Sequence, residues 1–134
     1  MEILPILKQF IKHLTVGENE VVLLDMEAGV EHFGRGVDNS VDLILMIVDP
    51  SFESLKLTKK IQQLGDSIGK TVFFVLNKVN GQILPTMLES IDDQSKVLAV
   101  ISEDTEIARK GLLGNELMME IPEIHTLARK ILKQ

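Results

Sequence analysis

The sequence predicts an α/β fold in which a mainly parallel sheet of about four strands is flanked by helices. Short runs that are continuously apolar and rich in Val, Ile and Leu are typical of parallel strands covered on both faces, and they occupy residues 21–24, 43–48, 72–76 and 97–101. Helical patterns lie between them. Because strands that alternate with helices form βαβ crossovers, we expect one parallel sheet in a single domain over residues 1–134.

The helices are predicted from apolar side chains at three- and four-residue spacing and from residues that begin or end a helix. The first stripe stops at Gly17, and Gly69 suits the left-handed residue after the second. Asp104 is a good N-cap for a short helix that ends at Gly111, and the last helix begins near Pro122. The apolar stripes cover residues 3–14, 57–68, 83–91, 107–108 and 124–132.

Charge and composition exclude several classes of protein. The chain carries 20 acidic and 14 basic side chains, for a net charge of −6, and the excess lies in the first 50 residues. This distribution lacks the basic footprint of a nucleic-acid-binding protein and favours a divalent cation in the first half. The sequence contains no cysteine, which excludes disulfides, thiolate nucleophiles and cysteine-ligated metals.

No segment of the sequence predicts a membrane span or a secretory signal. The longest apolar run, 43–48, is far shorter than the roughly 20 residues that a membrane-spanning helix needs. No basic region precedes an apolar stretch near Met1. We therefore expect a soluble, cytoplasmic protein that binds neither nucleic acid nor membranes.

Polar residues follow the predicted strands, where ligands collect in parallel α/β sheets. They are Asp25, Asp49, Asn77-Lys78 and Ser102–Asp104. An apolar strand that ends in Asp25, with Gly29 four residues later, suits a carboxylate that holds Mg²⁺ through water beside a glycine loop. The alternative is that Asp25 is an ordinary loop residue.

Asn77 has two interpretations. Its amide offers a donor and an acceptor together, which suits the edge of a nucleotide base. Alternatively, it braces the turn before Lys78. The acidic residues Glu27 and Glu31 with His32 fit no standard ligand spacing and indicate a solvated acidic face, in which Arg35 pairs with a neighbouring acid.

The segment 24–36, LDMEAGVEHFGRG, resembles the signature of the carbon monoxide dehydrogenase maturation ATPases. These CooC-like proteins are relatives of the MinD and ParA ATPases, which are deviant P-loop NTPases. Segments 41–51, 76–79 and 107–117 follow in the order that the family shows, so the resemblance extends from about residue 4 to residue 132. It implies the C-terminal part of a P-loop NTPase fold.

The resemblance implies an ATP-dependent dimer that helps to insert nickel into a metalloenzyme, with ATP and Mg as cofactors. Asp25 corresponds to the aspartate near Mg²⁺, and is catalytic if a partner supplies the phosphate loop. Asn77 corresponds to the adenine-contacting asparagine, with Lys78 beside it, and Gly29 to the switch glycine. Asp104 lies in the adenine-side loop. The implied partners are a second copy, a full-length ATPase or the metalloenzyme.

The 134 residues contain no match to the phosphate-binding motif G-x-x-x-x-G-K-[ST]. The pair Gly69-Lys70 follows a helix instead of preceding one. Without that loop, Asp25 and its acidic neighbours face a polyphosphate with no protein cation, and losing even one preorganised donor costs about 10²–10³ in rate. We therefore do not expect the chain alone to hydrolyse ATP. Where the phosphate-loop strand normally lies, we expect 21–25 to pair directly with 43–48.

Two functions remain open. The first is a degenerate, non-catalytic ATPase-like domain that acts as a binding or assembly module, which the resemblance links to nickel insertion into carbon monoxide dehydrogenase. The second is an ATP/Mg-binding component of a metallocentre-maturation ATPase whose phosphate loop comes from a partner. Binding of Mg-ATP by the isolated chain separates them.

Overall fold

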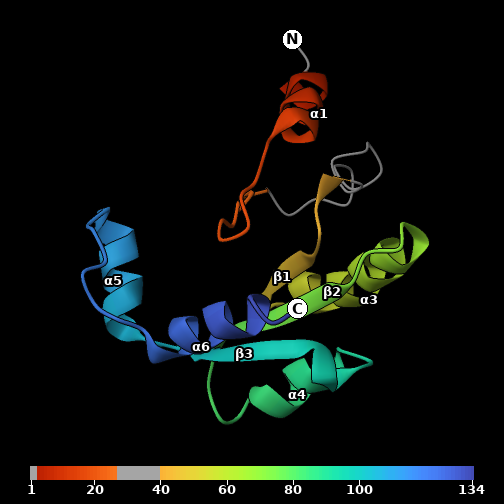
Figure 1. The fold of residues 1–134 in the computed structure, drawn as a ribbon. Coiled ribbons are helices and arrows are strands. Elements are labelled where there is room, and N and C mark those ends of the chain that lie inside the picture. Colours follow the sequence, from red (N-terminus) through yellow and green to blue (C-terminus); the bar gives the residue numbers. More distant parts are fainter. Residues whose placement is uncertain (1–2, 27–39) are drawn as a thin grey trace.

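A computed structural model describes residues 3–26 and 40–134 and contains a three-stranded parallel sheet in the order β1-β2-β3 (Figure 1). The predicted α/β fold is confirmed. Strand β1 pairs with β2 in a register that runs from Ile44 opposite Val72 to Val48 opposite Leu76. The strands span Ile44–Val48 (β1), Val72–Val79 (β2) and Val97–Ser102 (β3).

Helices connect and flank these strands, and their ends follow from local chemistry. Ser51 caps α3 by accepting a hydrogen bond from the Ser54 N–H at 3.2 Å. Gly69 is left-handed as predicted, with φ of 69°. The end of α5 differs from the prediction: Gly111 is helical, and the left-handed residue is Gly114, with φ of 66°. The helices span Ile3–His13 (α1), Phe52–Ser67 (α3), Leu84–Glu89 (α4), Gln94–Lys96 (η2), Thr105–Leu113 (α5) and Pro122–Ile131 (α6).

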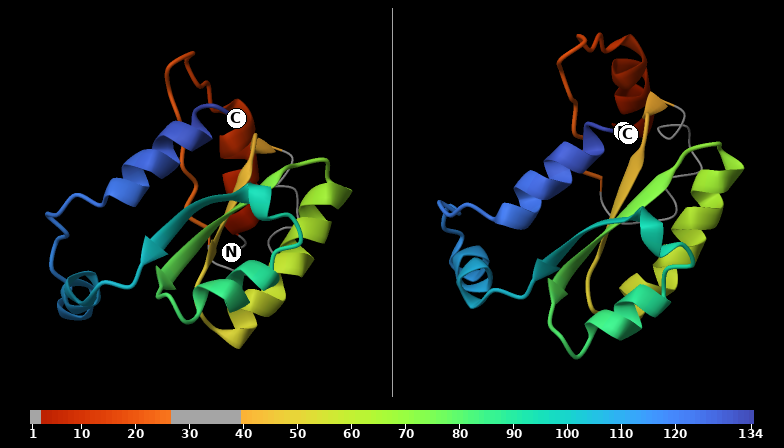
Figure 2. Two further views of the ribbon diagram at one scale, coloured as in Figure 1. Left: turned by 90° about the horizontal axis from the view of Figure 1, so that it is seen from below. Right: turned by 60° about the horizontal axis from the view of Figure 1, so that its bottom comes forward.

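The helices cover both faces of the sheet (Figure 2). On one face, Val72, Phe74 and Leu76 of β2 pack in a core with residues of α3 and α4. On the other face, Val75 packs with residues of β3 and with Leu127 of α6. This alternation along β2 is the period of two that a strand imposes. It explains why the run 72–76 is apolar at every position.

The predicted strand at 21–24 is wrong. In the described part of the chain these residues form no strand, and β1 pairs only with β2, so the expected pairing of 21–25 with 43–48 is also absent. Val21, Val22 and Leu23 are 56%, 47% and 82% exposed. Apolar composition favours a strand only where a neighbouring strand accepts its hydrogen bonds, and no strand among the described residues pairs with this segment.

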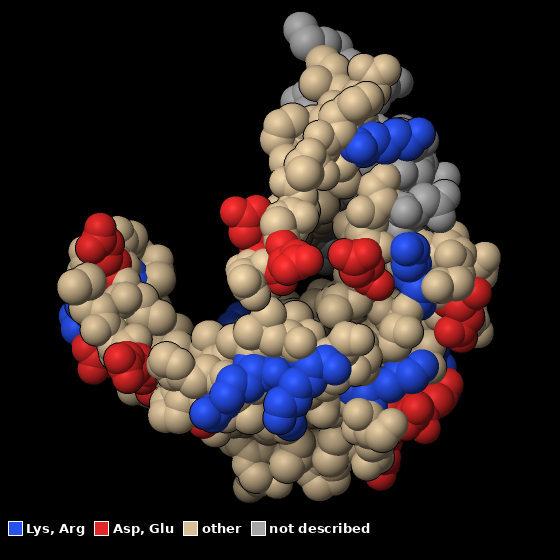
Figure 3. Space-filling model, viewed as in Figure 1, with Lys and Arg blue, Asp and Glu red and all other residues tan. Residues whose placement is uncertain are grey.

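Helix α5 projects from the end of β3 that is opposite η2 and forms an arm beside the body of the protein (Figure 3). It buries none of its side chains, and Leu112 is 87% exposed. On the same view, basic side chains gather over α6, whose last turn contains Arg129 and Lys130. Among residues 3–26 and 40–134, every helix is too short or too polar to cross a lipid bilayer.

Candidate functional site

The parallel sheet brings polar residues from three strands to one edge. Asp49 directly follows β1, Asn77 and Lys78 are the last residues of β2 before Val79, and Asp104 lies two residues after β3. The backbone N–H of Glu103 donates to the carbonyl of Val79 at 2.9 Å and holds the ends of β2 and β3 together. The carboxyl edge of the sheet is the position where α/β proteins bind ligands.

Asp49, Asn77 and Lys78 form one cluster across the ends of β1 and β2. Nδ2 of Asn77 donates to Oδ1 of Asp49 at 2.9 Å. Nζ of Lys78 donates to Oδ2 of the same carboxylate at 2.7 Å. The two carboxylate oxygens therefore have different partners, both from β2, and we call these three residues the Asp49 cluster.

The backbone of β2 explains how two consecutive residues reach one carboxylate. In a regular strand, neighbouring side chains point to opposite faces of the sheet. Here the β2–β3 register shifts between Leu76 and Val79, and Lys78 has a left-handed backbone with φ of 54°. A left-handed conformation costs a residue other than glycine roughly 1–2 kcal/mol. The residue with this unfavourable conformation, Lys78, is the one whose ammonium group contacts Asp49.

The turn after β1 holds Asp49 in place. Its backbone N–H donates to Oγ of Ser54 at 3.1 Å, and its carbonyl accepts from the Ser51 N–H at 2.8 Å. Burial raises the pKa of Asp49, but hydrogen bonds from Lys78 and Asn77, with the positive charge of Lys78, outweigh it. The net pKa lies below the ordinary value of 3.8, so the carboxylate is ionised at neutral pH.

The lowered pKa predicts how the Asp49 cluster responds to acid. Because the folded pKa lies below the unfolded value, the cluster stabilises the protein fully above pH about 4, and this contribution is lost as pH falls through the folded pKa. Asp49→Asn should lower the free energy of unfolding at pH 7 by less than about 1 kcal/mol, since the ion pair is partly exposed. Urea unfolding should show this difference narrow between pH 4 and pH 2.5. A difference that stays constant would contradict the ion pair.

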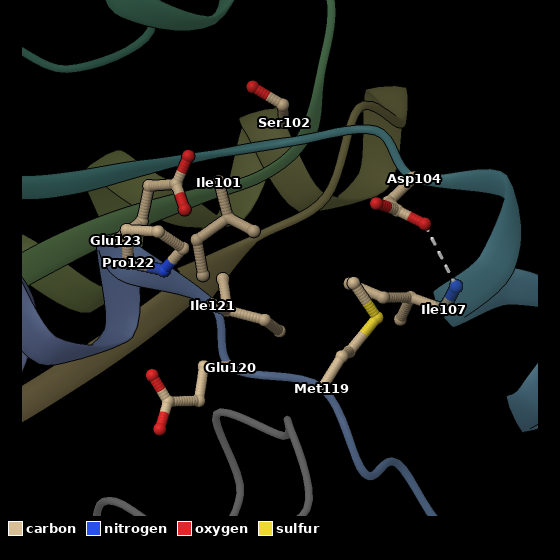
Figure 4. A pocket seen from close by; sticks show the side chains of 9 residues that line it. All are labelled: Ile101, Ser102, Asp104, Ile107, Met119, Glu120, Ile121, Pro122 and Glu123. Carbon is tan, nitrogen blue, oxygen red and sulfur yellow. Dashed lines mark hydrogen bonds between the residues drawn. The ribbon is translucent and has the colours of Figure 1, made fainter.

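Asp104 caps helix α5 beside a small cavity. Its Oδ1 accepts hydrogen bonds from the N–H groups of Glu106 and Ile107 at 2.8 and 3.0 Å. The cavity measures about 210 Å³ and lies between the end of β3 and the segment that leads into α6 (Figure 4). It has apolar walls that include Ile101 and Ile121, with three acids at its rim: Asp104, Glu120 and Glu123. In the structure the carboxylate of Asp104 therefore acts as the N-cap of α5.

Among the described residues, no hydrogen bond or ion pair joins Asp25 to the Asp49 cluster. Asp25 is exposed, and the residues before it, 21–24, do not form the expected strand. Gly29, Glu27, Glu31, His32 and Arg35 lie outside the described residues. Within 3–26 and 40–134, no three acidic or histidine side chains gather as a set that could hold a metal.

Sequence reasoning placed Asp49 at a strand end without giving it a role. In the structure it is the centre of the cluster, and both interpretations of Asn77 bear on it: the amide braces the turn through Asp49, while its oxygen accepts no hydrogen bond from any described residue. The signal was an acid and an amide-lysine pair at the ends of successive strands. The left-handed Lys78 carried no such signal, since that conformation is uncommon outside glycine, asparagine and aspartate.

These features define an α/β protein whose helix-flanked parallel sheet is consistent with part of a P-loop NTPase fold. No protein-family model matches the chain. It is 43% identical over 128 residues to an uncharacterized ATP-binding protein of Methanocaldococcus jannaschii, covering 96% of this chain and 51% of the relative. It is 33% identical over 110 residues to the carbon monoxide dehydrogenase accessory protein CooC of Rhodospirillum rubrum, covering 81% of this chain and 42% of CooC.

A second uncharacterized ATP-binding protein of M. jannaschii is 32% identical over 118 residues, which cover 86% of this chain and 46% of that protein. The chain thus spans about half the length of the curated relatives that it matches. The similarities support the relationship to CooC-like ATP-binding proteins that segment 24–36 indicated.

Proposed function

We propose that the chain provides the base-binding side of a CooC-like ATP site, with Asn77 as the residue that contacts adenine. The observation that carries this proposal is the Asp49 cluster: an amide is held at the carboxyl edge of a parallel sheet, with its oxygen left without a partner among the described residues. The similarity to proteins named as ATP-binding supports the choice of nucleotide.

We further propose that the triphosphate is held by a loop outside these 134 residues, from a partner or another segment. The ion pair at the edge supports this division of the site, because Nζ of Lys78 already pairs with Oδ2 of Asp49 at 2.7 Å. Phosphoryl transfer depends mainly on positioning and electrostatic stabilisation. Asp25 would act near Mg²⁺ only in the assembled site. Asp25→Asn should then abolish ATP hydrolysis by a mixture of the chain with the partner that supplies the phosphate loop.

The test is a titration of the isolated chain with Mg-ATP. Base contacts alone should give a dissociation constant in the millimolar range, and no phosphate should be released. Asn77→Ala should weaken binding about thirtyfold, since it removes the two amide hydrogen bonds to the base, each worth about 1 kcal/mol. Asn115→Ala is the matched control, because Asn115 lies in the exposed segment after α5.

Three results would contradict the proposal. Micromolar binding by the isolated chain would mean that it already holds the triphosphate. Equal binding by the Asn77 and Asn115 variants would remove Asn77 from the site. No binding at 10 mM, a concentration about ten times a millimolar dissociation constant, would exclude the base-binding function.

A non-catalytic assembly module is the second candidate function, and exposed apolar side chains favour it. Phe10 of α1, Leu23 and Met118 are 61%, 82% and 82% exposed, respectively. Large exposed apolar patches mark interaction sites. The partner would be a second copy, a full-length relative or a metalloenzyme whose nickel site is being assembled, as the similarity to an accessory protein of carbon monoxide dehydrogenase suggests. Absence of nucleotide binding would favour this candidate.

A further inference from the structure

Only one orientation of the Asn77 side-chain amide is compatible with its contact to Asp49. The ionised carboxylate of an aspartate accepts hydrogen bonds and donates none. The group of Asn77 that faces Oδ1 of Asp49 at 2.9 Å must therefore be the amide nitrogen. The amide oxygen of Asn77 then lies on the other branch of the side chain.

The second carboxylate oxygen is also in use, which strengthens this constraint. Nζ of Lys78 donates to Oδ2 at 2.7 Å, and the backbone of Asp49 is tied to Ser54 at 3.1 Å. Asp49 therefore cannot turn away from Asn77 without losing a charge-assisted hydrogen bond, which is about twice as strong as a neutral one. Asp49, at the end of β1, therefore holds the amide of Asn77, and Lys78, next to Asn77 in β2, holds Asp49.

A locked amide distinguishes two kinds of purine. Adenine presents an exocyclic amine as a donor next to a ring nitrogen that accepts. An amide with its oxygen toward the amine and its second N–H toward the ring nitrogen satisfies both groups. A 6-oxopurine places an oxygen that accepts where adenine has its amine, so the amide must be flipped to donate to it; on the N1 edge its ring N–H also donates, which reverses the whole pattern.

We propose that Asp49 is a positioning residue that sets the purine preference of this site, by fixing the amide of Asn77 in the orientation that matches a 6-aminopurine. This inference rests on the proposed base-binding function. Asp49 itself does not contact the base. It acts through Asn77, and its loss should change selectivity more than affinity for a purine as such.

The experiment compares the binding of Mg-ATP and Mg-ITP, which differ only in the 6-amino or 6-oxo group and the adjoining ring nitrogen. The chain should prefer ATP about tenfold, the factor that corresponds to one hydrogen bond of about 1.4 kcal/mol. Asp49→Asn should reduce the preference to within about twofold, because a neutral amide at position 49 accepts or donates and lets Asn77 flip. Asp49→Glu, which keeps the carboxylate, should restore part of the preference.

Asp92→Asn is the matched control, because it is the same chemical change at an exposed acid that pairs with Lys59 at 3.5 Å. It should keep the tenfold preference. A second readout is the pair of side-chain amide NMR signals of Asn77, identified by their loss in Asn77→Asp. These signals should shift in Asp49→Asn and stay in place in Asp92→Asn, with thermal unfolding confirming that each variant is folded.

The outcomes separate this inference from the proposed function. A preference for ATP that survives in Asp49→Asn, or equal binding of both nucleotides by the unmodified chain, would overturn the inference and leave the base-binding function standing. Failure of both nucleotides to bind the unmodified chain would overturn both. Unmoved Asn77 signals in Asp49→Asn would show that Asp49 does not hold the amide.

Discussion

Replacing Phe74 by Ala is expected to lower the free energy of unfolding by about 3–5 kcal/mol, because the change removes a large side chain from a closely packed core. Phe74 lies in the middle of β2, is 0% exposed, and packs in one cluster with Val48 and Met87. The cost is a substantial part of the roughly 5–15 kcal/mol that stabilises a typical domain. Urea or thermal unfolding followed by circular dichroism measures it.

Phe52→Ala is the matched control, since Phe52 is 75% exposed at the start of α3. Its ring lies 6.0 Å from Nζ of Lys56, an exposed cation–π contact worth less than about 1 kcal/mol. If Phe74→Ala cost no more than Phe52→Ala, the core between the sheet and α3 would not be as the structure shows.

Gly65→Ala should have the second-largest effect, because α3 passes too close to β2 for a methyl group at this position. A Cβ on Gly65 would lie 2.5 Å from Cγ2 of Val72 and 2.8 Å from the carbonyl oxygen of Lys70. Val72 is buried and the carbonyl belongs to the backbone, so neither can move freely. Overpacking of this kind costs about 1–3 kcal/mol.

Gly111→Ala tests the same substitution where space is open. Gly111 lies within α5, and apart from its chain neighbours and the backbone of its own helix, no heavy atom would lie within 4 Å of the added Cβ. Ala should stabilise this helix by about 0.5–1 kcal/mol, since glycine is a poor helix former. The two glycine variants should therefore differ by about 1.5–4 kcal/mol in urea unfolding. Equal effects would contradict the close packing of α3 on β2.

Much of the fold could be predicted because its signals are local. The continuous apolar run of β2 predicted a strand covered on both faces, and Asp104 predicted the start of α5 from its capping chemistry. The run at 21–24 has the same composition as a strand, but its first three residues are exposed and it forms no strand. Strand formation depends on a neighbour that composition does not specify.

The candidate site could be predicted only in part, for a different reason. The carboxyl ends of parallel strands predicted which residues would come together, and Asp49, Asn77 and Lys78 do meet there. Their pairing depends on a left-handed residue at Lys78, which has no signature in the sequence. Asp25 was expected at this edge because it ends the predicted strand at 21–24, and residues 21–24 form no strand in the described part of the chain.

A direct measurement of the division of the site is to compare the affinities of the chain for adenosine and for Mg-ATP. If the 134 residues hold only the base, the triphosphate adds no favourable contact, and the two dissociation constants should agree within about threefold, a difference below about 0.7 kcal/mol. Mg-ATP binding about 100-fold tighter than adenosine would show that the chain holds the phosphates, and would contradict the proposed division.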